Sequence, residues 1–490
     1  MRRIPTILAV VVALGGCAGI KAPGQGNNGT AGNSGTGARS GGVGGTGVRP
    51  DGGVNPGGCQ NLQCQQTSCT QGACVQHACP NGEKTTLSGT VYDPGGRTPL
   101  YNVIVYVPNA DLAPITDGVT CDQCNGTATG SPIASALTDA TGHFTLDNAP
   151  VGSNIPLVIQ IGKWRRQVAI PAVAACQDNP VADADHSLLR LPANQTEGHL
   201  PKIALATGHS DALDCLMRKI GVADSEFTPD SGTGRIHMYV GGAGSASNQG
   251  SDRLASTGAM FADAYANLYP SYTKLAGYDI LILQCEGSQL SNAKTPPMMA
   301  NIRRYADNGG RIFDEHLNSI WISDGLPPWP DTANWLQSVD TNDPPSPLTT
   351  NIDDTFPKGA ALADWLQVVQ ATTTRGQIVL NGVQHSVDTV LASSQRWIYR
   401  TDISPSQTEY LTFNTPVEAP TASQCGRVVF TDVHVGTGGG SSAPGAPGFP
   451  SLCSPNLTMS AQEKALEFMF FDLSSCVQPE NVPPTPIPIP

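Results

Sequence analysis

The stretch YDILIL, residues 278–283, decides the fold of the C-terminal half of the chain. Its run of aliphatic residues shows no polar alternation, which is typical of a strand buried on both faces of a parallel sheet. A helical pattern over residues 298–307 follows, Gly309 and Gly310 end it, and residues 311–313 (RIF) form the next strand. Strands that alternate with helices predict a doubly wound α/β domain.

The same pattern extends in both directions from this stretch. IALA at 203–206 is another buried strand, and Ser210 is placed to cap a helix whose apolar residues between 213 and 220 share one face. Near the C-terminus, GRVVF at 426–430 predicts a strand and residues 461–473 an amphipathic helix. We therefore expect a flavodoxin-like α/β domain over residues 201–476, followed by a Pro-rich tail at 477–490.

A different sequence pattern, of short strands and turns, precedes this domain. Residues 87–92 (LSGTVY) lead into the turn DPGG at 93–96, and valines alternate at 103, 105 and 107. Short strand patterns recur at 138–146 and 156–161. We expect an all-β sandwich over residues 86–192, which would make the chain multidomain: a sandwich followed by an α/β domain. A Pro-containing junction separates the two, so we expect the sandwich to fold independently.

Within 86–192 the chain resembles the carboxypeptidase regulatory-like (transthyretin-like) family. The matching features are GTVYDPGG at 89–96, PLYNVIVYV at 99–107, TDATGHF at 138–144 and PVG at 150–152. This resemblance implies a seven-stranded β-sandwich that serves as an accessory module in secreted proteins. It carries over no catalytic residue.

From residue 201 the chain resembles the class I glutamine-amidotransferase-like superfamily, and within it the ThuA-like group. The matching pieces are YDILIL at 278–283, the helix ending in GGR at 309–311, the strand that runs into His316, and GRVVFTDVH at 426–434. Catalytic amidotransferases carry a Cys on a strained elbow after the strand that follows this helix. Here that place holds Glu315 and His316, so the resemblance implies the fold without the amidotransferase activity.

Residues 1–17 have the order of a secretory signal peptide. Arg2 and Arg3 supply positive charge, residues 4–14 a short apolar run, and LGGC at 14–17 resembles a bacterial lipobox. We expect lipidation of Cys17, with an ordinary signal peptide and an incidental Cys as the alternative. No second apolar run is long enough to span a bilayer, so membrane attachment would depend on the lipid. Ala18 is not the Asp of inner-membrane retention, which favours the outer membrane or cell surface.

The Gly-rich segment at 18–58 has too few apolar residues to fold, so we expect a flexible tether there. The chain has 490 residues and a formal net charge of −13, and only 14% of its residues are charged. This balance argues against nucleic acid as a partner. The basic run KWRR at 163–166 stands out and could contact an anionic sugar or lipid, a solvated strand face, or another domain.

Fourteen cysteines after a signal peptide indicate an oxidising compartment and disulfides. Lipidation of Cys17 would leave an odd number, so a free thiol, an intermolecular bridge or a bound ligand must be considered. We expect a Cys-rich stalk at 59–85, with a metal site as its alternative, a loop-stapling Cys121–Cys124 disulfide, and a Cys215–Cys285 bridge. The disulfide candidates are Cys59, Cys64, Cys69, Cys74, Cys79, Cys121, Cys124, Cys215 and Cys285.

Reactive side chains follow three of the expected parallel strands. Cys285 follows the first, Glu315 and His316 the second, and Asp432 and His434 the third. Ligands of open α/β sheets bind beyond the carboxyl ends of the strands, so these five residues are the candidate pocket. If the strands are neighbours, the two imidazoles should lie within about 10 Å of each other.

This pocket suits acid–base chemistry or a divalent metal, but the residues do not single out either. We assign no catalytic residue, resident metal or cofactor. We expect a membrane-anchored cell-envelope lipoprotein with a non-catalytic binding role, its ligand a carbohydrate or an envelope component. The alternative is a hydrolase or isomerase that acts on a sugar derivative through His316 and His434.

Overall fold

The computed structural model describes residues 75–336, 344–435 and 448–488, which all belong to one compact unit of the chain, Gly53–Pro490. The expected signal peptide, Cys17, the tether at 18–58, and Cys59, Cys64, Cys69 and Cys74 lie outside the described residues. Within the described ranges, no helix has the length and apolar character needed to cross a membrane.

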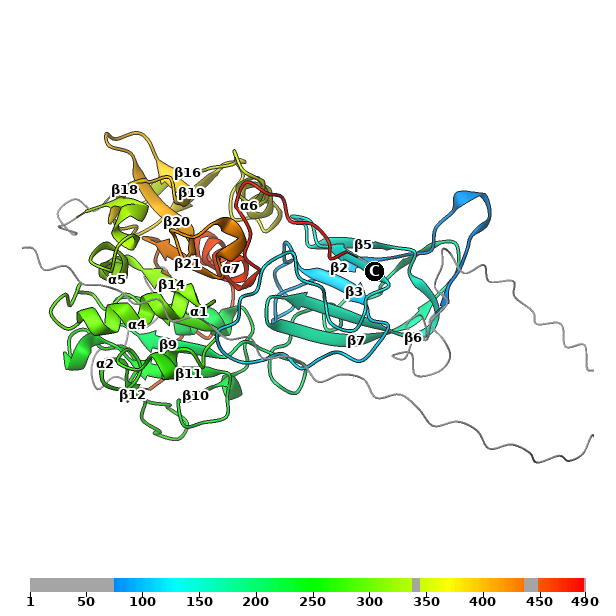
Figure 1. Ribbon diagram of the computed structural model, residues 1–490. Coiled ribbons are helices and arrows are strands. Elements are labelled where there is room, and N and C mark those ends of the chain that lie inside the picture. Colours follow the sequence, from blue (N-terminus) through cyan, green and yellow to red (C-terminus); the bar gives the residue numbers. More distant parts are fainter. Residues whose placement is uncertain (1–74, 337–343, 436–447, 489–490) are drawn as a thin grey trace, which may run out of the picture. The chain divides into compact units, whose positions relative to one another are not determined.

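Two sheets form the predicted β-sandwich (Figure 1). The first has the order β1-β6-β3-β4, with β7 also paired to β6, and all its pairs are antiparallel. The second has the order β5-β2-β8. Leu87 and Phe144 from the second sheet share one core with Val105 and Ile159 from the first. The strands are β1 (Val75–Gln76), β2 (Thr86–Thr90), β3 (Ile104–Val107), β4 (Ala134–Leu137), β5 (His143–Asp147), β6 (Pro150–Ile161), β7 (Trp164–Val173) and β8 (Asp178–Pro180).

The remaining sequence builds one large mixed sheet of order β10-β11-β9-β13-β14-β21-β20-β19-β16-β17. Every pairing from β10 to β21 is parallel, and every pairing from β21 to β17 is antiparallel. The antiparallel half is not predicted from the sequence. Its strands are β9 (Ile203–Thr207), β10 (Phe227–Pro229), β11 (Ile236–Val240), β12 (Ala262–Asp263, paired to β11), β13 (Ile280–Leu283), β14 (Arg311–Glu315), β16 (Leu348–Ile352), β17 (Gln377–Leu380), β19 (Ser394–Arg400), β20 (Gln407–Thr415) and β21 (Gly426–Thr431). A separate two-stranded sheet consists of β15 (Ala333–Trp335) and β18 (Val387–Val390).

Helices cover both faces of the parallel half. Ile282 and Phe313 point to the face that packs with α1 and α7, whereas Leu281 and Ile312 pack with α4 on the other face. The expected helices at 298–307 and 461–473 are confirmed as α4 and α7. Ser210 does not cap α1, because the N-cap position is Ala212. The α-helices are α1 (Leu213–Lys219), α2 (Ala264–Asn267), α3 (Tyr272–Leu275), α4 (Pro296–Asp307), α5 (Ile320–Ser323), α6 (Pro357–Val368) and α7 (Ala461–Ser474).

The sandwich and the large sheet share a hydrophobic core. The ring of Trp164 at the start of β7 lies 6.2 Å from that of Phe470 and 5.9 Å from that of Phe471 on α7. Both disulfides that begin in residues 121–124 cross to the C-terminal part of the chain. The sandwich is therefore tied to the C-terminal part of the chain by shared packing and two disulfides, and its independent folding stays a prediction.

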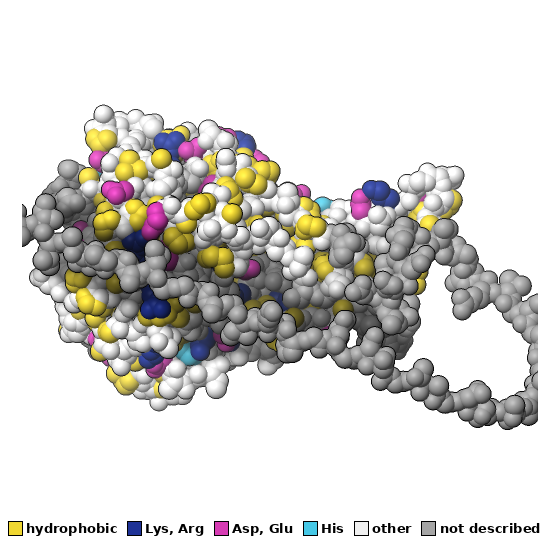
Figure 2. All heavy atoms as spheres, viewed as in Figure 1, with side chains coloured by type: hydrophobic (Ala, Val, Ile, Leu, Met, Phe, Trp, Pro, Cys, Tyr) yellow, Lys and Arg dark blue, Asp and Glu magenta, His cyan; other side chains and the backbone are white. Residues whose placement is uncertain are grey.

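The basic run at 163–166 belongs to this contact. Nζ of Lys163 donates a 2.6 Å bond to Asp279, which lies just before β13, and Trp164 is fully buried. Arg165 and Arg166 donate to backbone carbonyls of Ala113 and Ser187. The run therefore acts as a contact within the fold. Figure 2 shows that the charged side chains of the described residues are scattered over the visible face among apolar and neutral ones.

Candidate functional site

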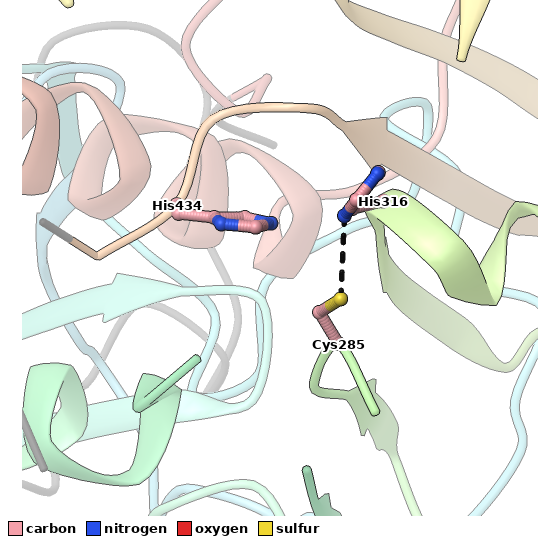
Figure 3. Close-up of side chains that lie close together, drawn as sticks. All are labelled: Cys285, His316 and His434. Carbon is pink, nitrogen blue, oxygen red and sulfur yellow. Dashed lines mark hydrogen bonds between the residues drawn. The ribbon is translucent and has the colours of Figure 1, made fainter. Parts of the chain in front are cut away.

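Three neighbouring parallel strands bring Cys285, His316 and His434 to one edge of the large sheet. β13 pairs with β14 and β14 with β21, and each of these residues lies just beyond the end of its strand. Figure 3 shows the thiol of Cys285 and the ring of His434 both directed toward the His316 ring. We call these three side chains, together with Glu315 and Asp211, the strand-end cluster.

The distances within the cluster are short. Sγ of Cys285 lies 3.4 Å from Nδ1 of His316 (Figure 3). The centroids of the His316 and His434 rings are 5.1 Å apart, with 57° between the ring planes. One potential ligand atom from each of Cys285, His316 and His434 lies within 4.8 Å of the other two. The cluster therefore joins a thiol and two imidazoles from segments up to 149 residues apart in sequence.

His316 occupies a strained backbone position between β14 and the short helical turns that follow it. Its φ is 45°, in the left-handed region that non-glycine residues rarely adopt. The 3-10 turn His316–Ser319 and helix α5 come directly after it. A strand, a tight turn and a short helix therefore meet at His316, which directs its imidazole toward Cys285.

Two carboxyl groups complete the cluster. Glu315 is fully buried, and its Oε2 accepts the backbone N–H of Cys285 at 3.2 Å. Asp211 follows β9 and accepts the backbone N–H of Val435 at 3.0 Å. Ligand atoms of Asp211, Glu315 and His434 also lie within 4.8 Å of one another. Asp211 is missed by the sequence reasoning, although the end of the strand at 203–206 would have pointed to it by the same rule as for the other strands.

Asp432 is buried but is held by a different partner. Its carboxylate accepts the backbone N–H of Ser386 at 2.7 Å and the hydroxyl of Ser386 at 2.8 Å. Burial raises the pKa of Asp432 to about 7. Of the five candidate pocket residues, the structure brings Cys285, Glu315, His316 and His434 into one group and gives Asp432 a role in fixing the segment before β18.

Burial sets the charge state of the cluster. It raises the pKa of the Cys285 thiol to about 12 and lowers that of His316, which also faces His434, to about 2. The pKa of Glu315 lies well above its usual range, because burial and the neighbouring Asp211 both disfavour the carboxylate. At neutral pH the thiol and the His316 imidazole are therefore uncharged, unlike the thiolate–imidazolium pair of a cysteine nucleophile.

Lys294 is a further buried group that the sequence reasoning does not find. Its side chain is fully buried, and Nζ donates to Oδ1 of Asn318 at 2.8 Å and lies 3.5 Å from Glu286. Asn318 belongs to the turn that begins at His316, and Glu286 follows Cys285. Lys294 thus supports the two loops that carry the thiol and the first imidazole. A single lysine before a helix gives no sequence signal for this role.

The disulfides differ from those expected. Cys285 is a buried free thiol, and Cys215 bonds Cys453 instead, because Cys215 lies within α1 rather than in the strand-end loops. Cys121 and Cys124 do not bond each other, since each faces a cysteine of the C-terminal part of the chain. The disulfides among the described residues are Cys79–Cys176, Cys121–Cys425, Cys124–Cys476 and Cys215–Cys453.

A second candidate site is an open groove on the sandwich, with a volume of about 250 Å³. The rings of Tyr92 and His186 stack in it at 3.7 Å with 10° between their planes, and His186 is fixed by a 2.9 Å bond to the carbonyl of Gly96. We call it the sandwich groove. Its polar and aromatic lining consists of Ser88, Thr90, Tyr92, His143, Asp183 and His186.

No protein-family model matches the chain, and no curated protein matches it. Among solved structures, a ThuA-like protein from Bacteroides uniformis is 9% identical, with a TM-score of 0.30 over 55% of this chain and 89% of that one. A type II cohesin–X-dockerin complex from Acetivibrio cellulolyticus matches in two interface variants. One is 17% identical, with a TM-score of 0.15 over 26% of this chain and 78% of that one. The other is 16% identical, with a TM-score of 0.16 over 28% and 85%. These TM-scores are too low to establish a shared fold.

Proposed function

We propose that this chain is a cell-envelope lipoprotein that binds a carbohydrate or another envelope component without transforming it. The observation that carries the proposal is the sandwich groove. Hydroxyl, imidazole and carboxyl groups surround the rigid Tyr92–His186 ring pair there. The groove is smaller than the ~300–1,000 Å³ of sites for drug-sized molecules, so it suits a ligand of about one sugar ring.

The chemistry of the groove fits a saccharide. A sugar ring presents apolar C–H groups on its faces and hydroxyls on its edge, and Tyr92 combines an apolar ring with a polar tip. Thr90 and His143 can exchange hydrogen bonds with ring hydroxyls, and Asp183 can accept them. A neutral polar ligand also suits a chain with a formal net charge of −13.

The strand-end cluster supports a non-catalytic role. The elbow position holds His316 instead of a Cys, and the nearby thiol of Cys285 is fully buried and uncharged. The part of the chain that the structure describes therefore presents no activated cysteine nucleophile at the place where the resembled superfamily would have one.

Binding of polysaccharide to the full-length chain tests this proposal. Soluble peptidoglycan fragments and O-polysaccharide serve as probes, with retardation in affinity electrophoresis as the readout. We expect Tyr92→Ala to raise the dissociation constant obtained from retardation by at least about tenfold, since truncation of an anchoring aromatic ring costs about 1–2 kcal/mol or more. Tyr272→Ala, a half-buried tyrosine of α3 outside the groove, is the matched control and should leave it unchanged. Retardation that is absent, or equal in Tyr92→Ala and wild type, rejects the proposal.

A hydrolase or isomerase acting on a sugar derivative remains the second candidate, favoured by the 5.1 Å separation of the His316 and His434 rings. At this distance one imidazole could accept a proton from a bound substrate while the other donates one to it, as general base and general acid. Turnover of chromogenic glycosides that is lost in His316→Ala would favour this candidate over a binding role.

The domain types are also part of the proposal. We assign the larger body to the doubly wound, flavodoxin-like class and to the ThuA-like group, and the sandwich to the carboxypeptidase regulatory-like family. The order β11-β9-β13-β14-β21 supports the first assignment, because it is the 2-1-3-4-5 order of flavodoxin-like sheets. The motifs quoted above support the other two. The lipid anchor at Cys17 and a surface or outer-membrane location complete the proposal.

A further inference from the structure

We propose that the strand-end cluster is a binding site for a divalent transition-metal ion, with Zn²⁺ as the best fit, held by Cys285, His316 and His434. This inference goes beyond the carbohydrate-binding role, which depends on the sandwich groove. The sequence assigns no metal but leaves a divalent ion as one use of this pocket, and the structure adds that the donor groups of three side chains converge.

The spacing of the donor atoms carries the proposal. In a tetrahedral zinc site, Zn–S is about 2.3 Å and Zn–N about 2.0–2.1 Å, so neighbouring ligand atoms lie about 3.5 Å apart. Sγ of Cys285 and Nδ1 of His316 are 3.4 Å apart, and the ligand atoms of all three side chains lie within 4.8 Å of one another. Rotation of side chains alone can therefore close the site around one ion.

The chemistry of the donors selects the class of metal. One thiol and two imidazoles are soft to intermediate ligands, which suit Zn²⁺ and other late first-row ions and not Ca²⁺ or Mg²⁺. Nε2 of His434 is buried and has no hydrogen-bond partner among the described residues. Such an atom costs free energy unless a ligand satisfies it.

The surroundings can balance the charge of the ion. Binding releases the thiol proton to solvent, which leaves a thiolate, and the buried carboxyl group of Asp211 lies within 4.8 Å of the His434 donor. The positive charge of Lys294 does not oppose the ion directly, because its ammonium group is engaged by Asn318 and Glu286. Oε2 of Glu315 fixes the Cys285 loop through its backbone N–H, so Glu315 is a positioning residue for the thiol.

Metal titration of the full-length, chelator-stripped chain tests this site. Zn²⁺ is titrated by calorimetry and Co²⁺ by absorbance, because a thiolate ligand gives Co²⁺ a charge-transfer band. We expect wild type to bind one equivalent that Cys285→Ser and His434→Gln lose, together with the band. Any equivalents of metal ion that Cys285→Ser still binds belong to other cysteines of the chain. Glu315→Gln should retain the band and weaken binding by about 10- to 100-fold.

His199→Gln, a half-buried histidine just before β9 and outside both the cluster and the groove, is the matched control and should bind as wild type does. The melting temperature of each apo variant shows whether it is folded. Zn²⁺ should raise the melting temperature of wild type and His199→Gln, raise that of Glu315→Gln less, and leave those of Cys285→Ser and His434→Gln unchanged. Equal stoichiometry and spectra in wild type and Cys285→Ser overturn the site. The polysaccharide assay with Tyr92→Ala tests binding in the sandwich groove and does not depend on the strand-end cluster. Failure of the metal-site proposal is therefore distinguishable from failure of the carbohydrate-binding proposal.

Discussion

Cys285 and His316 face each other across two neighbouring parallel strands, with Sγ and Nδ1 3.4 Å apart. In a solvated site this pair would exchange a proton and give a reactive thiolate. Here the thiol is fully buried, and its pKa is raised to about 12 while that of His316 falls to about 2. The contact therefore holds two neutral groups, which makes it a coordination or hydrogen-bonding pair and not a nucleophile.

This neutrality makes Cys285 unreactive in the folded chain. We expect iodoacetamide at pH 8 to leave Cys285 unmodified in the native, metal-free protein and to modify it fully after denaturation in guanidinium. Burial blocks access, and a pKa near 12 leaves almost no thiolate at that pH. Peptide mass spectrometry without reduction measures the modification at this residue. Native labelling as fast as that of a free cysteine peptide would contradict the charge state described here.

The sequence predicts the centre of the site well. The near-continuous apolar run at 278–283 and the strands that end before His316 and His434 predict parallel strands with a common carboxyl edge, and β13, β14 and β21 are adjacent. Strand order itself could not be read from spacing, because neighbours in a sheet need not follow each other in sequence. The position of Asp432 shows a further limit, since its side chain bonds Ser386, a residue from a distant segment.

Disulfide pairing was the least predictable feature. Only two residues separate Cys121 from Cys124 in the sequence. Yet Cys121 bonds a cysteine 304 residues away and Cys124 bonds one 352 residues away. Many connectivities are compatible with a given set of cysteines, and only the fold chooses among them. The partners Cys176, Cys425, Cys453 and Cys476 were absent from the predicted set for this reason. The antiparallel strands β16–β20 also escaped prediction, because they interrupt an otherwise regular α/β pattern.

The two crossing disulfides should stabilise the contact between the sandwich and the C-terminal segment. We expect Cys121→Ser with Cys425→Ser to lower the free energy of unfolding by about 2–5 kcal/mol, since each bridge closes a long loop in the unfolded chain. The loss of this one bridge should cost a free energy toward the lower end of that range, because the Cys124–Cys476 bridge still restricts the same segments of the unfolded chain. Denaturant unfolding with tryptophan fluorescence measures the change.

Non-reducing peptide maps provide the direct check on this prediction. They should contain Cys121–Cys425 and Cys124–Cys476 peptides and no Cys121–Cys124 peptide. A map that shows the Cys121–Cys124 pairing would reject the crossing bridges and restore the local staple expected from the sequence.

Membrane attachment should depend on one residue. We expect Cys17→Ala to move the protein from the membrane fraction to the soluble exported fraction, because the lipid would be the anchor and two acyl chains are needed for stable binding. Cys285→Ser, which removes a cysteine from the folded body, is the matched control and should stay membrane-bound. Fractionation followed by immunoblotting measures the distribution. Firm attachment of Cys17→Ala would show a different anchor.

The buried acid pair Asp93 and Glu467 should make stability depend on pH. Asp93 lies in the turn after β2 and Glu467 on α7, and both are fully buried. Burial raises the pKa of Asp93 from 3.8 to about 6, against the lowering effect of the Arg97 backbone N–H, and burial together with the Asp93 charge holds the pKa of Glu467 well above its usual range. At a pH between the ordinary pKa of these carboxyl groups in the unfolded chain and their raised pKa in the folded chain, the folded chain holds protons that the unfolded chain has released.

The stability that this pair contributes is therefore fully present below about pH 4 and is lost as pH rises through 6 and beyond. For Asp93 the loss is of the order of 2–3 kcal/mol, at about 1.4 kcal/mol per pKa unit.

Glu467→Gln removes the second titrating group and the repulsion between the two carboxylates. Its melting temperature should therefore fall less than that of wild type between pH 4 and pH 7. Scanning calorimetry across this range measures both slopes. Asp402→Asn, at an exposed position, should keep the wild-type slope. Equal slopes for Glu467→Gln and wild type would mean that the pair is ionised in the folded chain, and its burial would then need a cation that balances it.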